Sequence, residues 1–141
     1  MTATLTGGCL CGAVRYTATA APLAVRMCYC RDCQYISAGS PSVNMMLPTA
    51  AVTFTGETRE YVSTADSGNV MHRRFCPACG TPISNQAEAR PQFVIVRVGT
   101  LDEPNAVAPD TAIWVESAPR WACIDPSLNH VARQPTPPVA R

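Results

Sequence analysis

The sequence predicts a small all-β fold with little helix, and three observations support this class. Short runs of residues alternate between apolar and polar side chains, which is the pattern of a strand with one buried face. Thirteen prolines and eight glycines interrupt these runs, so few windows are long enough for a helix. Seven of the eight cysteines fall into three tight clusters, a spacing typical of metal ligands that staple a small domain.

The strand pattern occurs in six segments. In chain order they are residues 13–19, 52–55, 59–62, 70–75, 92–98 and 111–115. Gly56 supplies a turn between the second and third of them, and one short helix is expected over residues 31–38, ending at Gly39.

The chain length suits one domain. Residues 1–130 are expected to form it and to bury about two thirds of their unfolded surface, which is enough for a real core. Residues 131–141 are Pro-rich and are expected to form an extended tail.

Charge and hydropathy exclude several classes of partner. The net charge is +1, and the basic residues are spread along the chain, so neither a nucleic acid nor a membrane is expected as a partner. No apolar run approaches the roughly 20 residues that span a bilayer, and the N-terminal residues MTATLTGG have no targeting pattern. A cytoplasmic location is expected, where clustered cysteines bind metal more often than they form disulfides.

The first predicted metal site is closed by four thiolates. Its ligands come from two pairs far apart in sequence: Cys9, Cys11, Cys76 and Cys79. Gly12 and Gly80 follow these pairs and can adopt the left-handed conformation that turns backbone N–H groups toward the sulfurs. Four thiolates favour a structural zinc, whose binding free energy of about 10 to 16 kcal/mol rivals the stability of a domain. This zinc is therefore expected to be part of folding.

The second predicted site has only three clustered ligands, Cys28, Cys30 and Cys33, within six residues. Three ligands leave one corner of a zinc tetrahedron open, as in catalytic sites. The alternative is that Cys123 or another group closes the site and makes this zinc structural as well. Cys123 is isolated between Ala122 and Ile124, where a cysteine usually behaves as a small hydrophobe. The two histidines, His72 and His130, are weaker candidates.

A zinc that already carries three thiolates suits a substrate thiol better than water. A free thiol has a pKa near 8.5 and is mostly protonated at neutral pH, whereas zinc binding deprotonates it. Lowering that pKa below 7 requires at least about 2 kcal/mol. The ligand count therefore indicates thiol activation, with hydrolysis by metal-activated water as the second choice.

Four segments carry a resemblance to a known family. They are GGCLCGAVRY, CYCRDCQYISAG, RRFCPACGTPI and IWVESAPRWACIDPSL, which together span about residues 5 to 130. They resemble the glutathione-dependent formaldehyde-activating enzyme family, which also contains centromere protein V. The resemblance implies a zinc-stapled all-β fold of several coiled antiparallel sheets, related to that of a small zinc protein acting on Rab GTPases. One departure is Tyr29, where family members typically have His.

The resemblance also implies roles for the cysteines and a reaction. Cys9, Cys11, Cys76 and Cys79 would bind a structural zinc, and Cys28, Cys30 and Cys33 a catalytic zinc. The implied activity is a carbon–sulfur lyase reaction in reverse, in which glutathione adds to formaldehyde to give S-hydroxymethylglutathione.

Candidate substrate contacts follow from position alone. Arg31 lies inside the triple cluster and Gln34 directly follows it, so they are the candidates for binding a substrate carboxylate or amide. Arg73 and Arg74 are further candidates of the same kind. Solvated arginines and ordinary turn capping are the competing interpretations. Trp114 and Trp121 would either wall a pocket or belong to the core.

Two other functions are open at this point. The first is a zinc-stabilised binding module in which both metals are structural and no reaction is catalysed. The second is an enzyme of the same fold that acts on a different thiol or electrophile.

Overall fold

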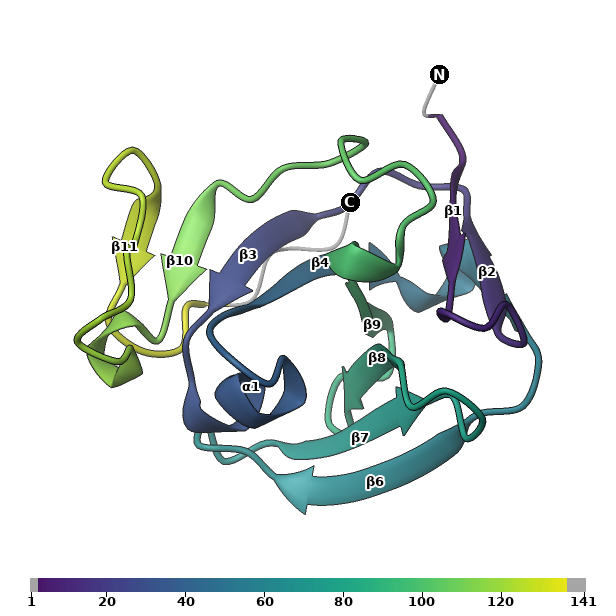
Figure 1. Cartoon of the computed structure of the whole chain (residues 1–141), viewed down its shortest axis with the longest axis horizontal. Helices are drawn as coiled ribbons and strands as arrows, with labels where there is room; N and C mark the ends of the chain where they lie inside the picture. The colour runs from purple at the N-terminus through teal and green to yellow at the C-terminus, as the bar shows by residue number, and fades with distance from the viewer. Residues whose placement is uncertain (1–2, 137–141) are drawn as a thin grey trace.

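Two β-sheets and one short α-helix make up the protein, for which a computed structural model describes residues 3–136 (Figure 1). The three-stranded sheet has the order β1-β2-β5, formed by β1 (Leu5–Gly8), β2 (Arg15–Ala18) and β5 (Val52–Thr55). The larger sheet has eight strands in the order β11-β10-β3-β4-β9-β8-β7-β6. These are β3 (Ala24–Cys28), β4 (Ser42–Pro48), β6 (Arg59–Thr64), β7 (Val70–Phe75), β8 (Pro82–Ala87), β9 (Phe93–Arg97), β10 (Thr111–Ile113) and β11 (Asn129–Val131).

The predicted all-β class is confirmed, and so are most of the predicted strands. The segments at 52–55 and 70–75 form strands with the expected limits, and the other predicted strands shift by a few residues. All strand pairings are antiparallel except those of β10, which runs parallel to both β3 and β11. Gly56 does form a turn, with φ 92°, but β5 and β6 on either side of it belong to different sheets.

Five strands were not expected from the sequence, and one of them, β11, has only three residues. β1, β3, β4 and β8 lack clear alternation between apolar and polar residues, because side chains on both of their faces are enclosed or because glycines replace them. In β4, Met45 and Leu47 are fully buried, while Asn44 and Met46 on the other face are only partly exposed. A strand enclosed on both faces gives no period-two pattern.

The hydrophobic core fills the space between the three-stranded sheet and one face of the larger sheet. From the small sheet come Tyr16 and Ala18, and from β4 and β9 of the large sheet come Met45, Leu47, Val94 and Val96, all in one cluster of buried residues. Because side chains alternate along a strand, the residues between them point to the opposite face of the large sheet.

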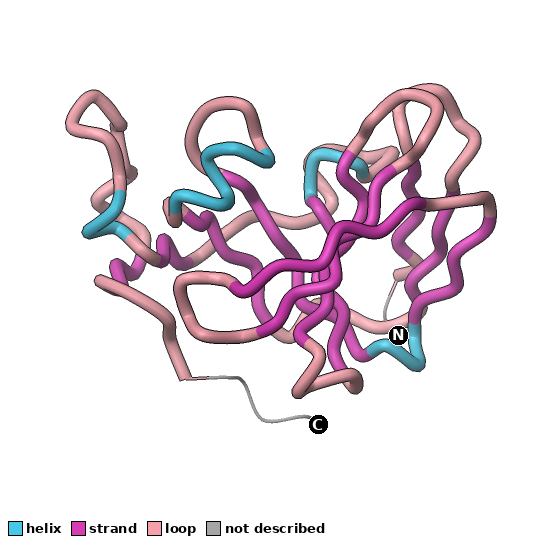
Figure 2. Tube along the Cα trace, turned by 90° about the horizontal axis from the view of Figure 1, so that it is seen from below, coloured by secondary structure: helices cyan, strands magenta, loops and turns pink. Residues whose placement is uncertain are grey.

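This opposite face lies on the side of helix α1 (Arg31–Ile36), where Cys28, Cys30 and Cys33 are found. Figure 1 shows the large sheet curling around α1, with β3 and β4 on one side of the helix and β6 and β7 on the other. Three short 3₁₀ helices, η1 (Thr49–Ala51), η2 (Val98–Thr100) and η3 (Val115–Ser117), follow β4, β9 and β10 in the chain, and Figure 2 shows helical segments bordering the strands. No helix among the described residues is long and apolar enough to cross a membrane.

Helix α1 is shorter than predicted. It ends at Ile36, and Ala38 rather than Gly39 takes the left-handed conformation that closes it, with φ 54°. The Gly39 N–H donates to the carbonyl of Gln34 at 3.0 Å, which satisfies one of the free helix carbonyls.

The predicted domain limit at residue 130 stays a prediction. β11 continues to Val131, and two residues after it contact the domain: Arg133 pairs with Glu116, and Gln134 accepts a hydrogen bond from the indole of Trp114. Residues 137–141 of the predicted tail lie outside the described residues.

Candidate functional site

Four cysteines meet where the β1–β2 turn faces the β7–β8 turn. The Sγ atoms of Cys9, Cys11, Cys76 and Cys79 all lie within 4.8 Å of one another. The Sγ atoms of Cys9 and Cys11 are 3.6 Å apart, and those of Cys11 and Cys76 are 3.8 Å apart. A tetrahedral zinc with bonds of about 2.3 Å to sulfur has edges of about 3.8 Å, so these residues fit a four-thiolate zinc.

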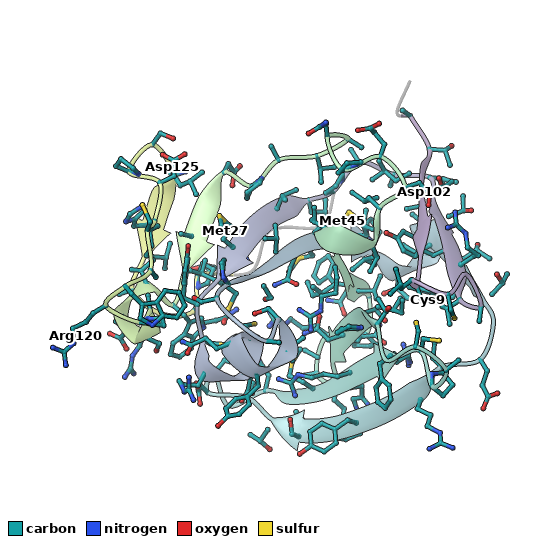
Figure 3. The ribbon with its side chains drawn as sticks, in the orientation of Figure 1. Cys9, Met27, Met45, Asp102, Arg120 and Asp125 are labelled. Carbon is teal, nitrogen blue, oxygen red and sulfur yellow. The ribbon has the colours of Figure 1, made fainter. Side chains whose placement is uncertain are left out.

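The turns that carry these cysteines have the predicted geometry. Gly12 and Gly80 both adopt positive φ, 83° and 77°, and their N–H groups donate to the carbonyls of Cys9 and Cys76. The Val14 N–H donates to the Cys9 Sγ at 3.2 Å and lowers the pKa of that thiol. A hydrogen bond between Cys79 and the Thr81 hydroxyl helps lower the pKa of Cys79 to about 5. These contacts favour the thiolate forms that a metal requires. Cys9 is labelled in Figure 3.

Three further cysteines meet at the junction of β3 and α1. The Sγ atoms of Cys28, Cys30 and Cys33 also lie within 4.8 Å of one another. Cys28 ends β3, and Cys30 caps the helix by accepting a hydrogen bond from the Cys33 N–H at 3.4 Å. Soft thiolates on a short strand-to-helix junction are a suitable ligand set for zinc.

Within residues 3–136, no histidine, carboxylate or further cysteine joins this three-cysteine cluster as a fourth ligand. Cys123, the candidate to close the site, is exposed and stands outside the cluster. His72 instead contacts Glu60 and Glu88, and His130 contacts the backbone carbonyl of Asp125. The donor set that the chain itself supplies is therefore three thiols.

A cavity of about 140 Å³ opens onto the three-cysteine cluster. Its floor is the face of the large sheet opposite the hydrophobic core, to which β3, β4, β7, β8 and β9 contribute alternate residues. Sheet register places Asn44 of β4 directly between Arg26 of β3 and Arg97 of β9. This row lies two residues along β3 from Cys28, on the same face of the sheet. One row further along, Arg73 of β7 pairs with Asn85 of β8, which in turn pairs with Ile95 of β9. These five polar residues all line the cavity.

Arg97 is the most deeply buried charge at this site, with 7 % of its surface exposed. Its Nη1 donates to Asn44 Oδ1 at 2.5 Å, while its Nε has no hydrogen-bond partner among the described residues. Burial lowers the pKa of Arg97, and the thiolate of Cys33 acts in the opposite direction. Arginine remains protonated in proteins, so Arg97 is a fixed positive charge beside the cysteines.

Two other polar groups of the cavity are also incompletely bonded. Arg73 reaches Asp32 through Nη2 at 3.0 Å and also contacts Ser63, but its Nε has no partner among the described residues. The Oδ1 of Asn85 is buried without a partner in the same part of the chain. Each buried polar atom left unpaired costs about 1 to 3 kcal/mol, so the polar part of the cavity is better satisfied when a ligand or water contributes groups.

The two predicted substrate contacts lie beside the cavity rather than in its lining. Gln34 is buried, and its amide donates to the backbone carbonyls of Tyr29 at 2.9 Å and Ser117 at 3.0 Å. Arg31 donates to the Gln34 Oε1, and its guanidinium lies 5.0 Å above the centre of the Tyr35 ring. These contacts tie α1 to the η3 segment, and binding of substrate by Arg31 and Gln34 stays a prediction.

Among the cavity-lining residues, sequence reasoning named Arg73 and Trp114 as candidates but missed others, above all Arg97 and Asn44. Both stand within strands whose other residues are mainly apolar, FVIVR and SVNMMLP. A polar residue at alternate positions of such strands is an indication that the second face meets a polar site. The pattern alone does not say that the two strands are neighbours.

Three aromatic residues singled out in the sequence differ in their position relative to the cavity. Trp114 lines the cavity and adopts the left-handed conformation, with φ 57°, which is uncommon for a bulky residue and typical of functional sites. Trp121 is 73 % exposed and belongs neither to the core nor to the cavity lining. Tyr29 is 2 % exposed and packs outside the cavity lining, with its N–H donating to the Ile113 carbonyl.

Comparison with known proteins supports the fold and identifies the family. A structural match is found with the crystal structure of a Rhodobacter sphaeroides protein, a structural-genomics target, at a TM-score of 0.54 and 20 % identity. The match covers 74 % of this chain and 91 % of that protein, and at this identity it shows the fold alone. No curated protein matches the sequence. The model of the family described as glutathione-dependent formaldehyde-activating enzyme matches residues 4–117, and the chain therefore belongs to that family.

Proposed function

We propose that the protein is a zinc enzyme that adds the thiol of glutathione to formaldehyde and forms S-hydroxymethylglutathione. The observation that carries this proposal is a cluster of three thiols, open on one side to a cavity that holds a buried arginine. The family membership supplies the names of the two substrates. The four-cysteine site, whose residues do not line the cavity, would hold a structural zinc.

The chemistry requires an ionised thiol and a stabilised oxygen. Zinc, when bound by Cys28, Cys30 and Cys33, would keep a substrate thiol in its thiolate form at neutral pH. The thiolate sulfur forms a bond to the carbonyl carbon, the π electrons of the C=O bond move to the oxygen, and that oxygen takes up a proton. The thiol loses one proton and the product hydroxyl gains one, so the addition is balanced.

The residues of the cavity have separate tasks in this scheme. Arg97 is a permanent positive charge beside the cluster, and it stabilises negative charge on the reacting sulfur and on the oxygen that develops from the aldehyde. Asn44 holds Arg97 in place through its 2.5 Å hydrogen bond. Asn85 and Arg73 offer an acceptor and a donor without partners, which suit the N–H and C=O of a peptide amide such as those of glutathione.

Charge in the cavity also favours an anionic substrate. Four arginines line it, Arg26, Arg73, Arg90 and Arg97, against one acidic residue, Asp66. Glutathione carries two carboxylates, and arginine binds carboxylates through paired N–H donors. Burial lowers the pKa of Arg26 and the positive charge of Arg90 acts in the same direction, so a substrate carboxylate beside Arg26 would favour its charged form.

The test is the rate of exchange between free formaldehyde and S-hydroxymethylglutathione, followed by NMR exchange spectroscopy with and without protein. Because thiols add to formaldehyde spontaneously, the rate is expressed as an increase over the reaction without protein. We expect the wild type to accelerate exchange and Cys30→Ser to remove the acceleration. Cys123→Ser is the matched control, since Cys123 lies outside both clusters.

The same pair of variants separates an enzyme from a zinc-stabilised binding module. An enzyme predicts that Cys30→Ser loses the acceleration and about one zinc while its circular dichroism spectrum stays that of the wild type. A wild type that accelerates nothing, together with a Cys30→Ser variant that unfolds, would indicate a second structural zinc instead.

A further inference from the structure

The cavity floor has a polar part and an apolar part. The row Arg26, Asn44 and Arg97 lies nearest the cysteines, and Asn85 and Arg73 lie one row further along, on β8 and β7. Six apolar side chains, which form the apolar end of the cavity, also line it: Ala24, Met46, Met71, Ala87, Phe93 and Ile95. Ala24, Met46 and Ile95 form a row on β3, β4 and β9 two residues beyond Arg26, Asn44 and Arg97, and this row meets Asn85 at β8.

These apolar side chains are not part of the hydrophobic core. The core takes the alternate residues of the same strands, Met45 and Leu47 of β4 and Val94 and Val96 of β9, which are all but completely buried. Met46 and Ile95 point to the opposite face and remain partly exposed. The large sheet thus presents an apolar surface in the same cavity as the three-cysteine cluster, with the row Arg26, Asn44 and Arg97 between them.

The substrates named for the family leave this apolar surface without a partner. Formaldehyde contains one carbon atom and cannot reach across it. Glutathione is a peptide with charged groups at both ends, and its amides match the unpaired groups of Arg97 beside the cysteines and of Arg73 and Asn85 on β7 and β8. Placing those polar groups against methionine and phenylalanine would leave them without hydrogen bonds, which is unfavourable.

We propose that the apolar end binds the hydrocarbon substituent of a larger aldehyde, so that the enzyme adds glutathione to apolar aldehydes of the form R–CHO as well as to formaldehyde. This inference rests on the proposed function and names its second substrate class. The sulfur–carbon bond forms, the π bond of the carbonyl breaks, and the proton lost by the thiol is balanced by the one gained on oxygen. The product is a hemithioacetal, and no oxidant or reductant is required.

The position of the apolar end supports the aldehyde as its occupant. On this face of the sheet, the polar row Arg26, Asn44 and Arg97 lies between the apolar end and Cys28. A carbonyl oxygen held at Arg97 would therefore direct the substituent of the aldehyde toward Met46 and Ile95. Each buried methylene of that substituent contributes about a fourfold gain in kcat/KM through the hydrophobic effect.

The test compares a series of aldehydes at fixed glutathione concentration: formaldehyde, acetaldehyde, propanal and butanal. Hemithioacetal formation is measured by NMR exchange spectroscopy, and each rate is divided by the rate without protein. Glycolaldehyde, which has as many heavy atoms as propanal but ends in a hydroxyl, serves as the polar comparison. The expected result is an acceleration that rises about fourfold per methylene, with propanal well above glycolaldehyde.

Two variants connect that preference to the apolar end. Ala24→Leu would fill this part of the cavity and lower the butanal to formaldehyde ratio of accelerations about tenfold or more, and Met46→Ala would lower it by several-fold through lost contacts. Ala106→Leu is the matched control, because Ala106 is exposed in the loop after η2. Thermal denaturation of each variant identifies any that fails to fold.

The outcomes separate this inference from the proposed function. Acceleration with formaldehyde but with none of the longer aldehydes overturns the inference and leaves the proposed function standing. Acceleration with no aldehyde at all overturns both. Equal preference for propanal and glycolaldehyde, or a butanal to formaldehyde ratio that Ala24→Leu leaves unchanged in a folded protein, also overturns the inference.

Discussion

Arg97 of β9 and Asn44 of β4 are directly paired in the large sheet, and the Arg97 guanidinium donates to the Asn44 side chain at 2.5 Å beside the three-cysteine cluster. A pair of polar residues in adjacent, otherwise apolar strands is costly to bury. The pair is therefore explained by what it does at the cavity, where it fixes a positive charge next to the thiols.

Arg97→Lys should lower kcat/KM for glutathione by about 10- to 100-fold. Lysine keeps the charge but cannot donate to Asn44 and a ligand from one planar group, and a lost charge-assisted hydrogen bond costs about 1.5 to 3 kcal/mol. The measurement is the formaldehyde exchange rate as a function of glutathione concentration. Arg59→Lys on β6, exposed and distant from the cavity lining, is the matched control. An unchanged kcat/KM in Arg97→Lys would show that Arg97 has only a packing role.

Asn44→Ala should act through the same contact. Because Asn44 positions Arg97, the effects of Asn44→Ala and Arg97→Lys are expected to be less than additive in the double variant. The double-mutant cycle is measured with the same exchange assay. Fully additive effects would mean that the two residues contribute independently.

Cys76→Ser should unfold the protein or lower its thermal midpoint severely, with loss of about one zinc per chain. Cys76 is fully buried and lies in the four-cysteine cluster, which joins the β1–β2 turn to the β7–β8 turn. Zinc content and the denaturation midpoint are the readouts. Cys123→Ser should change neither, since Cys123 is exposed and outside the clusters. Retention of all zinc by Cys76→Ser would contradict the ligand assignment.

His72→Gln should remove a pH-dependent part of the stability. Hydrogen bonds to Glu60 and Glu88 raise the pKa of His72 above its ordinary value near 6.5. A raised folded-state pKa gives stability that is fully present below the unfolded pKa and is lost as pH rises through the folded value. Thermal midpoints of the wild type and the variant should therefore differ most below about pH 6.5 and converge at higher pH, with His130→Gln as the control. A difference that grows with rising pH would contradict this sign.

The sequence predicted the class of the fold and both cysteine clusters because these depend on local pattern. Turn glycines such as Gly80 and the spacing of Cys76 and Cys79 are readable within a few residues. The cavity depends on which strands are neighbours, and β4 and β9 are separated by more than forty residues of chain. Arg97 and Arg31 illustrate the difference: sequence proximity suggested Arg31, whereas sheet register brings Arg97 to the three thiols.

The central claim is that the three-cysteine cluster holds a metal with one position open to a thiol, and the most direct test is the absorption spectrum of the cobalt-substituted protein. Addition of glutathione should strengthen the thiolate-to-cobalt charge-transfer band and shift the d–d bands. S-methylglutathione, whose sulfur cannot ionise, should produce neither change, and Cys30→Ser should abolish the response. No spectral change at saturating glutathione, or the same change in Cys30→Ser, would contradict the claim.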